Sequence, residues 1–416
     1  MSDALSLNSC CNARGELPVD LGRQSILDQV EALSAVETVP LADALGRVLA
    51  EDIRSPINVP GHDNSAMDGF AIRFSDLSEN ASSSLALAGE ALAGHPYAGT
   101  LPGGSAIRIM TGAMMPDGAD TVVMQEIVTC DEQQVQIPAG IKAGQNRRRA
   151  GEDIARDSIA LTRNTLVQAA EMGLLASLGV GQVQVKRRLK VAVLSTGDEV
   201  CAPGSAVDTG QIYDSNRFSL QGLLAPLGVE VIDLGIIADD PALLAEAFAS
   251  AARSADMIIT SGGVSVGEAD YVKQTLERIG QIHFWKMAMK PGRPLAFGRI
   301  ENAVFFGLPG NPVAVMVTFL QFALPAIRKM QGLDNWQPLT LPARAAERLR
   351  KRAGRTEFQR GIFNRDDAGQ LLVASSGTQG SGVLSSMSRA NCLIILPSDQ
   401  EDVDQGDVVD IQPLLF

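Results

Sequence analysis

The sequence of 416 residues is poor in cysteine and histidine, which limits the metal and redox chemistry that it can support. It holds five cysteines and three histidines, and no two cysteines form a Cys-x-x-Cys pair. Protein zinc sites are usually built from clusters of these two residue types. We therefore expect no zinc site, and the sequence shows no Ser-His-Asp or Cys-His catalytic pattern.

Long apolar runs and a surplus of basic charge are also missing. No run reaches the ~18 residues of a membrane helix, and the N-terminal residues lack the basic start and apolar core of a signal peptide. We expect a cytoplasmic protein that binds no membrane. The net charge of −13 argues against nucleic-acid binding. A small anionic substrate is not excluded, because local basic groups can reverse the global sign; the candidates are Arg147-Arg148-Arg149, Lys286, Lys290, Arg293 and Arg360.

The chain is too long for one core, and about 150 residues per domain predicts roughly two to four domains. Helices are predicted at Leu21–Leu33, Leu41–Ala50 and Leu166–Leu178, and short β runs separated by turns lie on either side of a stretch of alternating strands and helices. The predicted division is a mobile tail (1–18), a linker domain with helices (19–54 and 147–178), a small β-rich domain (55–146), an α/β domain (179–332) and a C-terminal β domain (333–416).

The alternation from Lys190 to Met330 predicts a parallel sheet with helices on both faces. Within it, the apolar run Asp256–Thr260 leads into a glycine-rich loop and a helix. A strand, loop and helix in this order present backbone N–H groups and a positive helix end to an anion. Glu268 and Asp270 of this loop would repel a bare phosphate, which indicates a divalent cation between the acids and the anion.

Polar loops follow the predicted strands, and the carboxyl ends of parallel strands meet at one edge of a sheet. Acids from three loops could hold a divalent cation, while lysines and backbone N–H groups could hold oxyanions. This favours phosphoryl or nucleotidyl chemistry, or the handling of another oxyanion. Several of these residues also have a purely structural interpretation, as helix caps or solvated lysines. The loops are Ser195–Glu199, Asp239–Asp240, Ser261–Asp270, Lys286–Pro294 and Pro309–Pro312.

Two polar stretches before the α/β region leave alternatives open. Asp63–Gly69 is either a turn with side-chain hydrogen bonds or a loop that reaches into a cleft. Arg147-Arg148-Arg149 is either a solvated run paired with Glu152 and Asp153 or part of an anion site.

Long motifs occur in a fixed order from about Leu21 to the C-terminus: PGHDNSAMDGFAI, IRIMTGAMMPDGADTVVMQE, GQNRRRAGEDI, LSTGDEV, GQIYDSN, SGGVSVGEADYV, KPGRPLAFG and GLPGNPVAV. Together they resemble the bacterial MoeA family of molybdopterin molybdenumtransferases, related to the C-terminal domain of gephyrin. The resemblance implies a multidomain α/β plus β protein. Its expected parts are a central doubly wound, molybdopterin-binding (MogA-like) α/β domain, a small β-rich domain, an elongated linker domain and a C-terminal β-barrel-like domain.

The resemblance also implies an activity: insertion of molybdate into adenylylated molybdopterin with release of AMP, the last step of molybdenum-cofactor biosynthesis. It implies a need for Mg²⁺ and a homodimer whose cleft is shared between subunits. Molybdopterin adenylyltransferase and molybdoenzyme maturation factors are the expected partners. A molybdopterin adenylyltransferase, a non-enzymatic molybdopterin-binding scaffold and a tungstate-handling paralogue remain alternatives.

Carried over by motif, the resemblance implies catalytic roles for Asp68, Thr111, Asp153, Glu199, Asp270, Lys286 and Lys290. The first three are expected to enter the cleft from the partner subunit. The implied metal ligands are Glu199, Asp239 and Asp270. The chain departs from many relatives at Arg293, where lysine is frequent. The implied substrate-binding residues are Thr196, Gly197, Asp198, Ser261, Gly262, Gly263, Arg293, Pro309, Gly310, Arg360 and Ser381.

Overall fold

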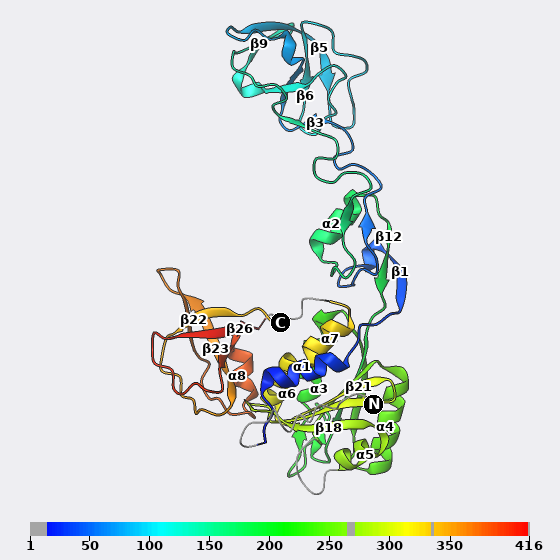
Figure 1. Cartoon of the computed structure of the whole chain (residues 1–416), viewed down its shortest axis with the longest axis vertical. Helices are drawn as coiled ribbons and strands as arrows, with labels where there is room; N and C mark the ends of the chain where they lie inside the picture. Colours follow the sequence, from blue (N-terminus) through cyan, green and yellow to red (C-terminus); the bar gives the residue numbers. More distant parts are fainter. Residues whose placement is uncertain (1–14, 264–270, 334–336, 415–416) are drawn as a thin grey trace. The chain divides into compact units, whose positions relative to one another are not determined.

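The computed structural model describes residues 15–263, 271–333 and 337–414 of the chain. The chain divides into two compact units (Figure 1). We call residues 1–37, 46–48 and 185–416 the large unit, and residues 38–45 and 49–184 the small unit.

A six-stranded sheet of order β16-β13-β17-β21-β20-β18 forms the centre of the large unit. Strands β16, β13, β17 and β21 are parallel, whereas β20 is antiparallel to both of its neighbours, β21 and β18. Strand β18 therefore runs in the same direction as β21, and five carboxyl ends lie at one edge of the sheet. The strands are β13 (Lys190–Thr196), β16 (Glu230–Ile237), β17 (Met257–Ser261), β18 (Gln281–Lys286), β20 (Pro294–Ile300) and β21 (Ala303–Leu308).

Helices cover both faces of this sheet, because alternate strand residues point to opposite sides. Val191 and Val193 belong to one buried cluster, together with residues of α1, α3, α6 and α7. Ala192 and Leu194 belong to another, together with residues of α4 and α5. The predicted doubly wound arrangement is confirmed. The helices are α1 (Val19–Gln29), α3 (Asn216–Leu224), α4 (Pro241–Ser254), α5 (Tyr271–Ile279), α6 (Pro312–Thr318) and α7 (Leu324–Met330), with a π-helical turn at Phe319–Ala323 between the last two.

The prediction of a fully parallel sheet was wrong for β20. Only Glu301 and Asn302 separate β20 from β21, and Glu301 turns the chain with a φ of 50°. A link this short can form a hairpin between antiparallel strands but cannot carry the crossover that parallel strands need. The absence of a helical pattern between the two runs was the signal for a hairpin.

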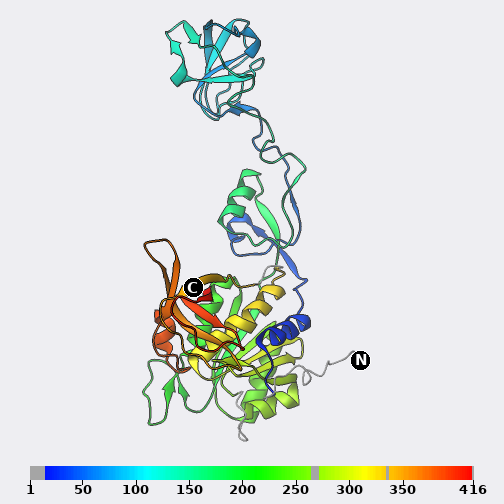
Figure 2. The same ribbon diagram turned by 60° about the vertical axis from the view of Figure 1, so that its left-hand side comes forward.

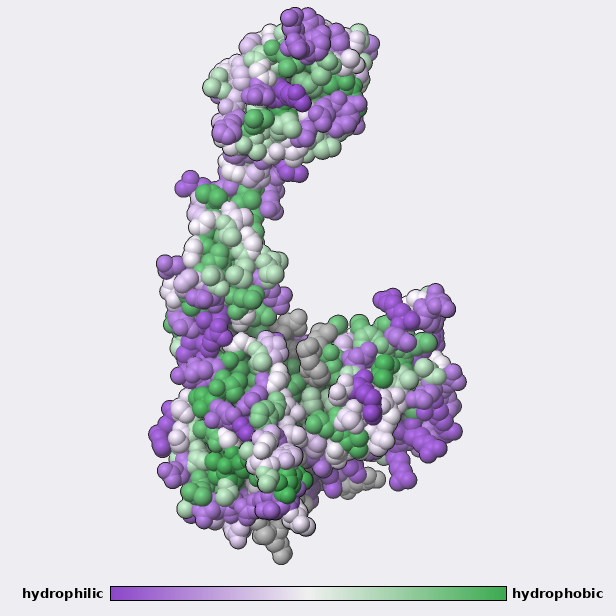
Figure 3. All heavy atoms as spheres, turned by 180° about the vertical axis from the view of Figure 1, so that it is seen from behind, coloured by the Kyte–Doolittle hydropathy of each residue, from purple (hydrophilic) through white to green (hydrophobic). Residues whose placement is uncertain are grey.

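The C-terminal strands close into a barrel, in which β23 pairs with β24, β24 with β22, β22 with β26, β26 with β25 and β25 with β23. Short β19 (Met289–Lys290) pairs with β23 and joins the barrel to the α/β region. Hydrophilic side chains gather over the outer side of this domain (Figure 3). The elements are β22 (Leu341–Ala345), β23 (Thr356–Arg365), β24 (Leu371–Ser375), α8 (Leu384–Arg389), β25 (Cys392–Leu396) and β26 (Val408–Pro413).

The small unit contains a second six-stranded sheet, of order β7-β4-β6-β5-β9-β8 (Figure 2). Its strands are β4 (Gly69–Ile72), β5 (Ser83–Ala91), β6 (Ser105–Ile109), β7 (Thr121–Met124), β8 (Thr129–Cys130) and β9 (Gln134–Ile137). The rest of the unit has paired short strands and one helix, α2 (Ala169–Ser177). The pairs are β2 (Ile53–Arg54) with β11 (Ile159–Leu161), β3 (Asn64–Ser65) with β10 (Arg147–Arg148), and β1 (Val36–Pro40) with β12 (Gln182–Lys186).

The structure differs from the predicted division at the N-terminus. Glu16 and Leu17, expected in a mobile tail, are buried, and Leu17 forms a bridge with Met287. Helix α1, expected in the linker domain, packs in the core of the large unit through Ile26 and Leu27. A one-face apolar pattern predicts that a helix packs, but does not say against which domain.

The predicted helix at Leu41–Ala50 was wrong. A single 3₁₀ turn at Leu41–Asp43 is followed by Gly46 with a φ of 74°. The backbone N–H of Leu49 then donates to Thr165, and that of Ala50 to Gln184. Pairing with distant chain segments therefore replaces the local helical bonds.

The stretch Pro312–Met330 is long and apolar enough to cross a membrane, but 78% of its most apolar window is buried inside the structure. It packs in the sheet core as α6, the π-helical turn and α7.

Candidate functional site

Asp68 and Thr111 form a polar cluster in the small unit. Because β4 and β6 are antiparallel, with Gly69 opposite Ile109, the residues just before β4 and just after β6 are neighbours. The Asp68 carboxylate accepts hydrogen bonds of 2.7 Å from the backbone N–H and from the hydroxyl of Thr111. These bonds, the backbone one first, lower the pKa of Asp68. The cluster is therefore a fixed, ionised acceptor.

The adjacent loops are joined by an ion pair that the sequence did not reveal. The Arg147 guanidinium donates to the Asp63 carboxylate, with an Nε–Oδ2 distance of 2.8 Å. Asp63 also accepts the Ala150 N–H at 2.7 Å, and this bond is the first cause of the lowered pKa of Asp63. Arg147 is thus committed to Asp63, and not to Glu152 or Asp153 as the solvated-run interpretation expected.

Asp153 lies exposed in the loop that Asp63 anchors. Its backbone N–H donates to the carbonyl of Val59 at 3.1 Å. The Asp68 and Asp153 loops are therefore neighbours connected through Asp63, although Asp153 itself projects from the loop surface.

Glycine loops shape the edge of the large-unit sheet where β13 and β17 end. Gly197, Gly262 and Gly263 have φ values of 129°, 93° and 64°, a region that favours glycine. A Cβ on Gly262 would lie 2.9 Å from the Thr196 carbonyl oxygen, and one on Gly263 would lie 2.3 Å from Val272. At these three positions the edge is therefore lined by backbone atoms.

A buried hydroxyl accompanies these loops. Thr196 is 3% exposed, and its Oγ1 has no hydrogen-bond partner among the described residues. An unsatisfied buried hydroxyl costs about 1–3 kcal/mol. A ligand on the glycine loops could supply the missing partner.

A hydroxyl and carboxylate network lies behind the loops. The Ser195 hydroxyl donates to Asp214 at 3.0 Å and lies 3.2 Å from the Ser261 hydroxyl. Asp214 also accepts from Arg217, which donates in turn to Asp233. The sequence pattern did not reveal this support, because it joins residues of different strands and a helix. Ser261, predicted to bind substrate, is buried and lies opposite Ser195 in the pairing of β17 with β13.

Asp198, Glu199 and Asp239 form an acid group at the ends of β13 and β16. The Asp239 N–H donates to the Asp198 carboxylate at 3.1 Å. Partial burial, and then the charges of Asp198 and Glu199, raise the pKa of Asp239. Oxygen donors that repel one another in this way suit a hard divalent cation. Asp270, the third predicted ligand, and Glu268 lie outside the described residues.

Among residues 15–263, 271–333 and 337–414, no three His, Cys, Asp or Glu side chains are arranged to hold a metal ion by themselves. The acid group of the described residues therefore needs a further donor to complete a cation site.

The predicted cations lie on or after β18. Lys286 is exposed at the end of this strand. The Lys290 ammonium lies 3.3 Å from the carboxylate of Glu357, and Arg293 lies 2.9 Å from the fully buried carboxylate of Glu16. Lys290 and Arg293 are thus each held beside a buried acid, and Lys290 remains half-exposed.

Arg360 is buried beside the loop that contains Ser381. It is 1% exposed and donates to the Ser386 hydroxyl and to the carbonyls of Thr378 and Gly380. Burial lowers the pKa of Arg360 to about 10, so the guanidinium stays charged at neutral pH. In this structure Arg360 braces the loop that contains Ser381, and its role towards substrate stays a prediction.

That loop lies beside the loop that follows β21. The carbonyl of Ser381 accepts the N–H of Val313, in the first turn of α6. Pro309 is buried, and the Gly310 carbonyl accepts from the Asn216 amide at 2.7 Å. The structure thus brings Ser381, Pro309 and Gly310 to the same edge as the glycine loops.

Three family models match the chain: the MoeA N-terminal region (domain I and II) at residues 17–179, a probable molybdopterin binding domain at 192–329, and the MoeA C-terminal region (domain IV) at 342–414. A Haemophilus influenzae protein named molybdopterin molybdenumtransferase is 47% identical over 402 residues, which cover 95% of this chain and 98% of that protein. The chain belongs to the MoeA family.

Other members of the MoeA family are similar to it along nearly the whole chain. A molybdopterin molybdenumtransferase of Nostoc is 38% identical and covers 93% of this chain and 91% of its own length. Gephyrin of Dictyostelium discoideum is 33% identical over 94% of this chain but only 61% of its own length. The crystal structure of a MoeA protein from Pyrococcus horikoshii matches with a TM-score of 0.83 at 29% identity, over 96% of this chain and 100% of that one.

The candidate residues are distributed over all three MoeA regions. Asp68 and Thr111 lie in the N-terminal region, and Arg360 and Ser381 in the C-terminal region. The glycine loops, the acid group, Lys286, Lys290, Arg293, Pro309 and Gly310 lie in the probable molybdopterin binding domain.

Proposed function

We propose that this protein inserts molybdate into adenylylated molybdopterin and releases AMP, as a molybdopterin molybdenumtransferase in molybdenum-cofactor biosynthesis. One observation carries most weight. Within the region similar to molybdopterin-binding domains, backbone-lined glycine loops, an acid group and Lys286 belong to the same edge of one sheet. Such an edge suits a ligand that carries phosphates together with a second oxyanion.

Each group has a separate task in this proposal. The loops around Gly197 and Gly262 bind the phosphates through backbone N–H groups, and the Thr196 hydroxyl donates to a phosphate oxygen. Lys286 and Lys290 hold molybdate and balance the charge that develops on it. The thiolates that bind molybdenum belong to the pterin, which explains how a chain with few cysteines can do this chemistry.

Glu199, Asp239 and Asp270 would hold Mg²⁺, and their oxygen donors suit this cation. When bound, Mg²⁺ polarises a phosphoryl group for attack. The raised pKa of Asp239 supports this assignment, because a cation would relieve the repulsion that causes the shift.

We further propose a cytoplasmic homodimer in which Asp68, Thr111 and Asp153 of one subunit complete the site of the other. Asp68 is held as an ionised acceptor by Thr111, which suits a role towards a ligand from elsewhere. Molybdopterin adenylyltransferase is the expected donor of the substrate, and molybdoenzyme maturation factors are the expected recipients of the product.

The test is to incubate the purified protein with adenylylated molybdopterin, Mg²⁺ and molybdate, and to measure AMP. We expect AMP release that depends on molybdate. Release at the same rate without molybdate, or no release, would sink the proposal. A parallel reaction with tungstate measures which oxyanion the protein prefers.

A further inference from the structure

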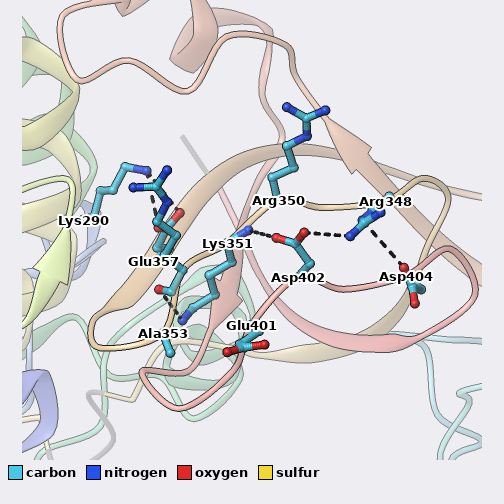
Figure 4. Close-up of a pocket in the computed structure, with 10 residues that line it drawn as sticks. Lys290, Arg348, Arg350, Lys351, Ala353, Glu357, Glu401, Asp402 and Asp404 are labelled. Carbon is cyan, nitrogen blue, oxygen red and sulfur yellow. Dashed lines mark hydrogen bonds and ion pairs between the residues drawn. The ribbon is translucent and has the colours of Figure 1, made fainter.

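A charged pocket of about 940 Å³ adjoins Lys290 in the large unit, between β19 and the C-terminal barrel (Figure 4). Most of its cations already have partners. Arg348 is paired with Asp402 at 2.9 Å, and the Lys351 ammonium donates to the Gln400 carbonyl at 2.6 Å. The pocket lining is Lys290, Arg348, Arg350, Lys351, Arg352, Ala353, Glu357, Glu401, Asp402 and Asp404.

Lys290 is the lining residue that also belongs to the proposed site, and Glu357 is its partner. Parallel pairing of β19 with β23 places Lys290 directly opposite Glu357. The ammonium lies 3.3 Å and 3.5 Å from the two carboxylate oxygens (Figure 4). The Lys290 side chain is 55% exposed, whereas that of Glu357 is 8% exposed. The buried acid is thus the fixed member of the pair and the lysine is the accessible one.

Glu357 is itself locked in place. The Gln359 amide donates to Glu357 Oε2 at 3.0 Å and to the Arg350 carbonyl at 2.8 Å. Gln359 is 6% exposed, so this clamp is inside the barrel wall. The barrel therefore sets the position of the Glu357 carboxylate, and the carboxylate sets that of the ammonium.

The geometry leaves Lys290 able to bind a second anion. An ammonium carries three donors, and charge-assisted N–H···O bonds are usually about 2.7–2.9 Å long. Distances of 3.3 Å and 3.5 Å describe a looser hold than this. An oxyanion at the pocket mouth can therefore meet the ammonium without displacing Glu357.

We propose that Glu357, clamped by Gln359, is a positioning residue that holds the Lys290 ammonium where a tetrahedral oxyanion of the molybdate class is received. This inference rests on the proposed function of Lys290. It adds to that function a barrel residue that touches neither substrate nor metal. The C-terminal domain would thus set how well the neighbouring domain binds its oxyanion.

The test compares Glu357→Gln with Glu401→Gln in the full chain. Both variants remove one negative charge from the same pocket, but only Glu357 contacts Lys290. We expect Glu357→Gln to raise the KM for molybdate about three- to fivefold, as befits a partly exposed ion pair, with kcat changed less than about twofold. We expect Glu401→Gln to change the KM for molybdate and kcat each by less than about 1.5-fold. An equal effect of the two variants on KM, or an unchanged KM in Glu357→Gln, would overturn the proposal.

Two further measurements keep the outcomes separate. Gln359→Leu removes the clamp without changing charge, and it should also raise the KM for molybdate. This variant tests the proposal if Glu357→Gln does not fold. Equilibrium dialysis with molybdate alone, in place of turnover, should show weaker binding by Glu357→Gln than by Glu401→Gln. A wild-type protein that binds molybdate but releases no AMP would refute the proposed function, while the dialysis still decides the role of Glu357.

Discussion

The carboxylate of Asp239 is destabilised in the folded protein, and its removal should stabilise the chain. Because the folded-state pKa of Asp239 is raised, ionisation costs free energy of folding above this pKa, and the cost disappears below the unfolded-state pKa. We expect Asp239→Asn to raise Tm by about 1–2 °C at pH 7.5, with a smaller gain as the solution is made acidic. Differential scanning calorimetry at a series of pH values measures this.

The exposed Asp117, outside the acid group, supplies a matched control. Asp117→Asn should leave Tm nearly unchanged at each pH. Millimolar Mg²⁺ should also reduce the difference in Tm between the wild type and Asp239→Asn. A lower Tm for Asp239→Asn at pH 7.5 would contradict the repulsion inferred at this site.

Thr111 keeps Asp68 ionised through two donors, of which its hydroxyl is one. Thr111→Val removes the hydroxyl and leaves the backbone N–H in place. We expect the pKa of Asp68 to rise towards its ordinary value but not to reach it, and the acid limb of the pH–rate profile to move to higher pH. Carboxyl-carbon NMR titration measures the shift, and Thr111→Ser, which retains the donor, should behave like wild type.

At the residue scale, the types of residue at the candidate site could be predicted from the sequence, but their hydrogen-bond and ion-pair partners could not. The acids and lysines of the strand-end loops were evident because polar residues there stand out from apolar strands. The Arg147–Asp63 pair joins residues 84 positions apart, and no local pattern encodes such a contact. The burial of Arg360 was missed for the same reason, since arginine is rarely buried and its acceptors are two backbone carbonyls and the Ser386 hydroxyl, 18 to 26 positions away.

At the element scale, Arg360 connects strand β23 to the loop that carries Ser381. Arg360→Ala would leave the acceptors on Thr378, Gly380 and Ser386 without their donor, in a buried site. We expect this variant to lose about 2–4 kcal/mol of unfolding free energy, measured by urea denaturation of the large unit's transition. Arg365→Ala, at an exposed position of the same strand, should lose less than about 0.5 kcal/mol.

Arg360→Lys distinguishes the effect of the hydrogen bonds made by Arg360 from the effect of its positive charge. Lysine retains a cation but cannot reproduce the fork of donors that reaches several acceptors. We expect an intermediate loss of stability together with a raised KM, because the Ser381 loop would shift on the α6 terminus. Full activity and stability in Arg360→Lys would show that charge alone matters at this position.

Elements with a clear hydrophobic periodicity were predicted well. Elements held by backbone hydrogen bonds to distant parts of the chain were not. The apolar strands β13, β17 and β21 and the capped helix α4 follow from periodicity and from the Asp240-Pro241 start. The segment Leu41–Ala50 has a helical composition, yet the backbone N–H groups of Leu41, Leu49 and Ala50 donate to residues more than a hundred positions away. Short strands such as β3 and β10, of two residues each, carry too little pattern to be recognised.

At the scale of the whole molecule, the candidate residues are divided between two units. Asp68 and Thr111 belong to the small unit, whereas the glycine loops, the acid group and Lys290 belong to the large unit. The predicted domains already separated these residues, but a site shared between them was expected only through the family resemblance, because periodicity does not report which surfaces of separate domains meet. In a homodimer with shared sites, the small unit of one subunit and the large unit of the other would each contribute residues to one site.

This homodimer predicts complementation between two inactive variants. Asp68→Ala and Glu199→Ala should each lower molybdate-dependent AMP release at least about a hundredfold. In a mixed dimer, one site combines the intact Glu199 of one subunit with the intact Asp68 of the other, and the second site carries both substitutions. Random exchange at equal amounts makes half of the dimers mixed. We therefore expect about a quarter of the wild-type activity after denaturation and co-refolding of the two variants.

The same experiment distinguishes a shared site from one built within a single subunit. If Asp68 and Glu199 serve the same subunit, every dimer carries one damaged residue in each site, and co-refolding restores nothing. The matched control co-refolds Lys290→Ala with Glu199→Ala, whose residues both belong to the large unit. This pair should stay inactive if Lys290 and Glu199 of one subunit act together in the same site. Recovery by the first pair alone would establish that Asp68 acts in the site of the partner subunit.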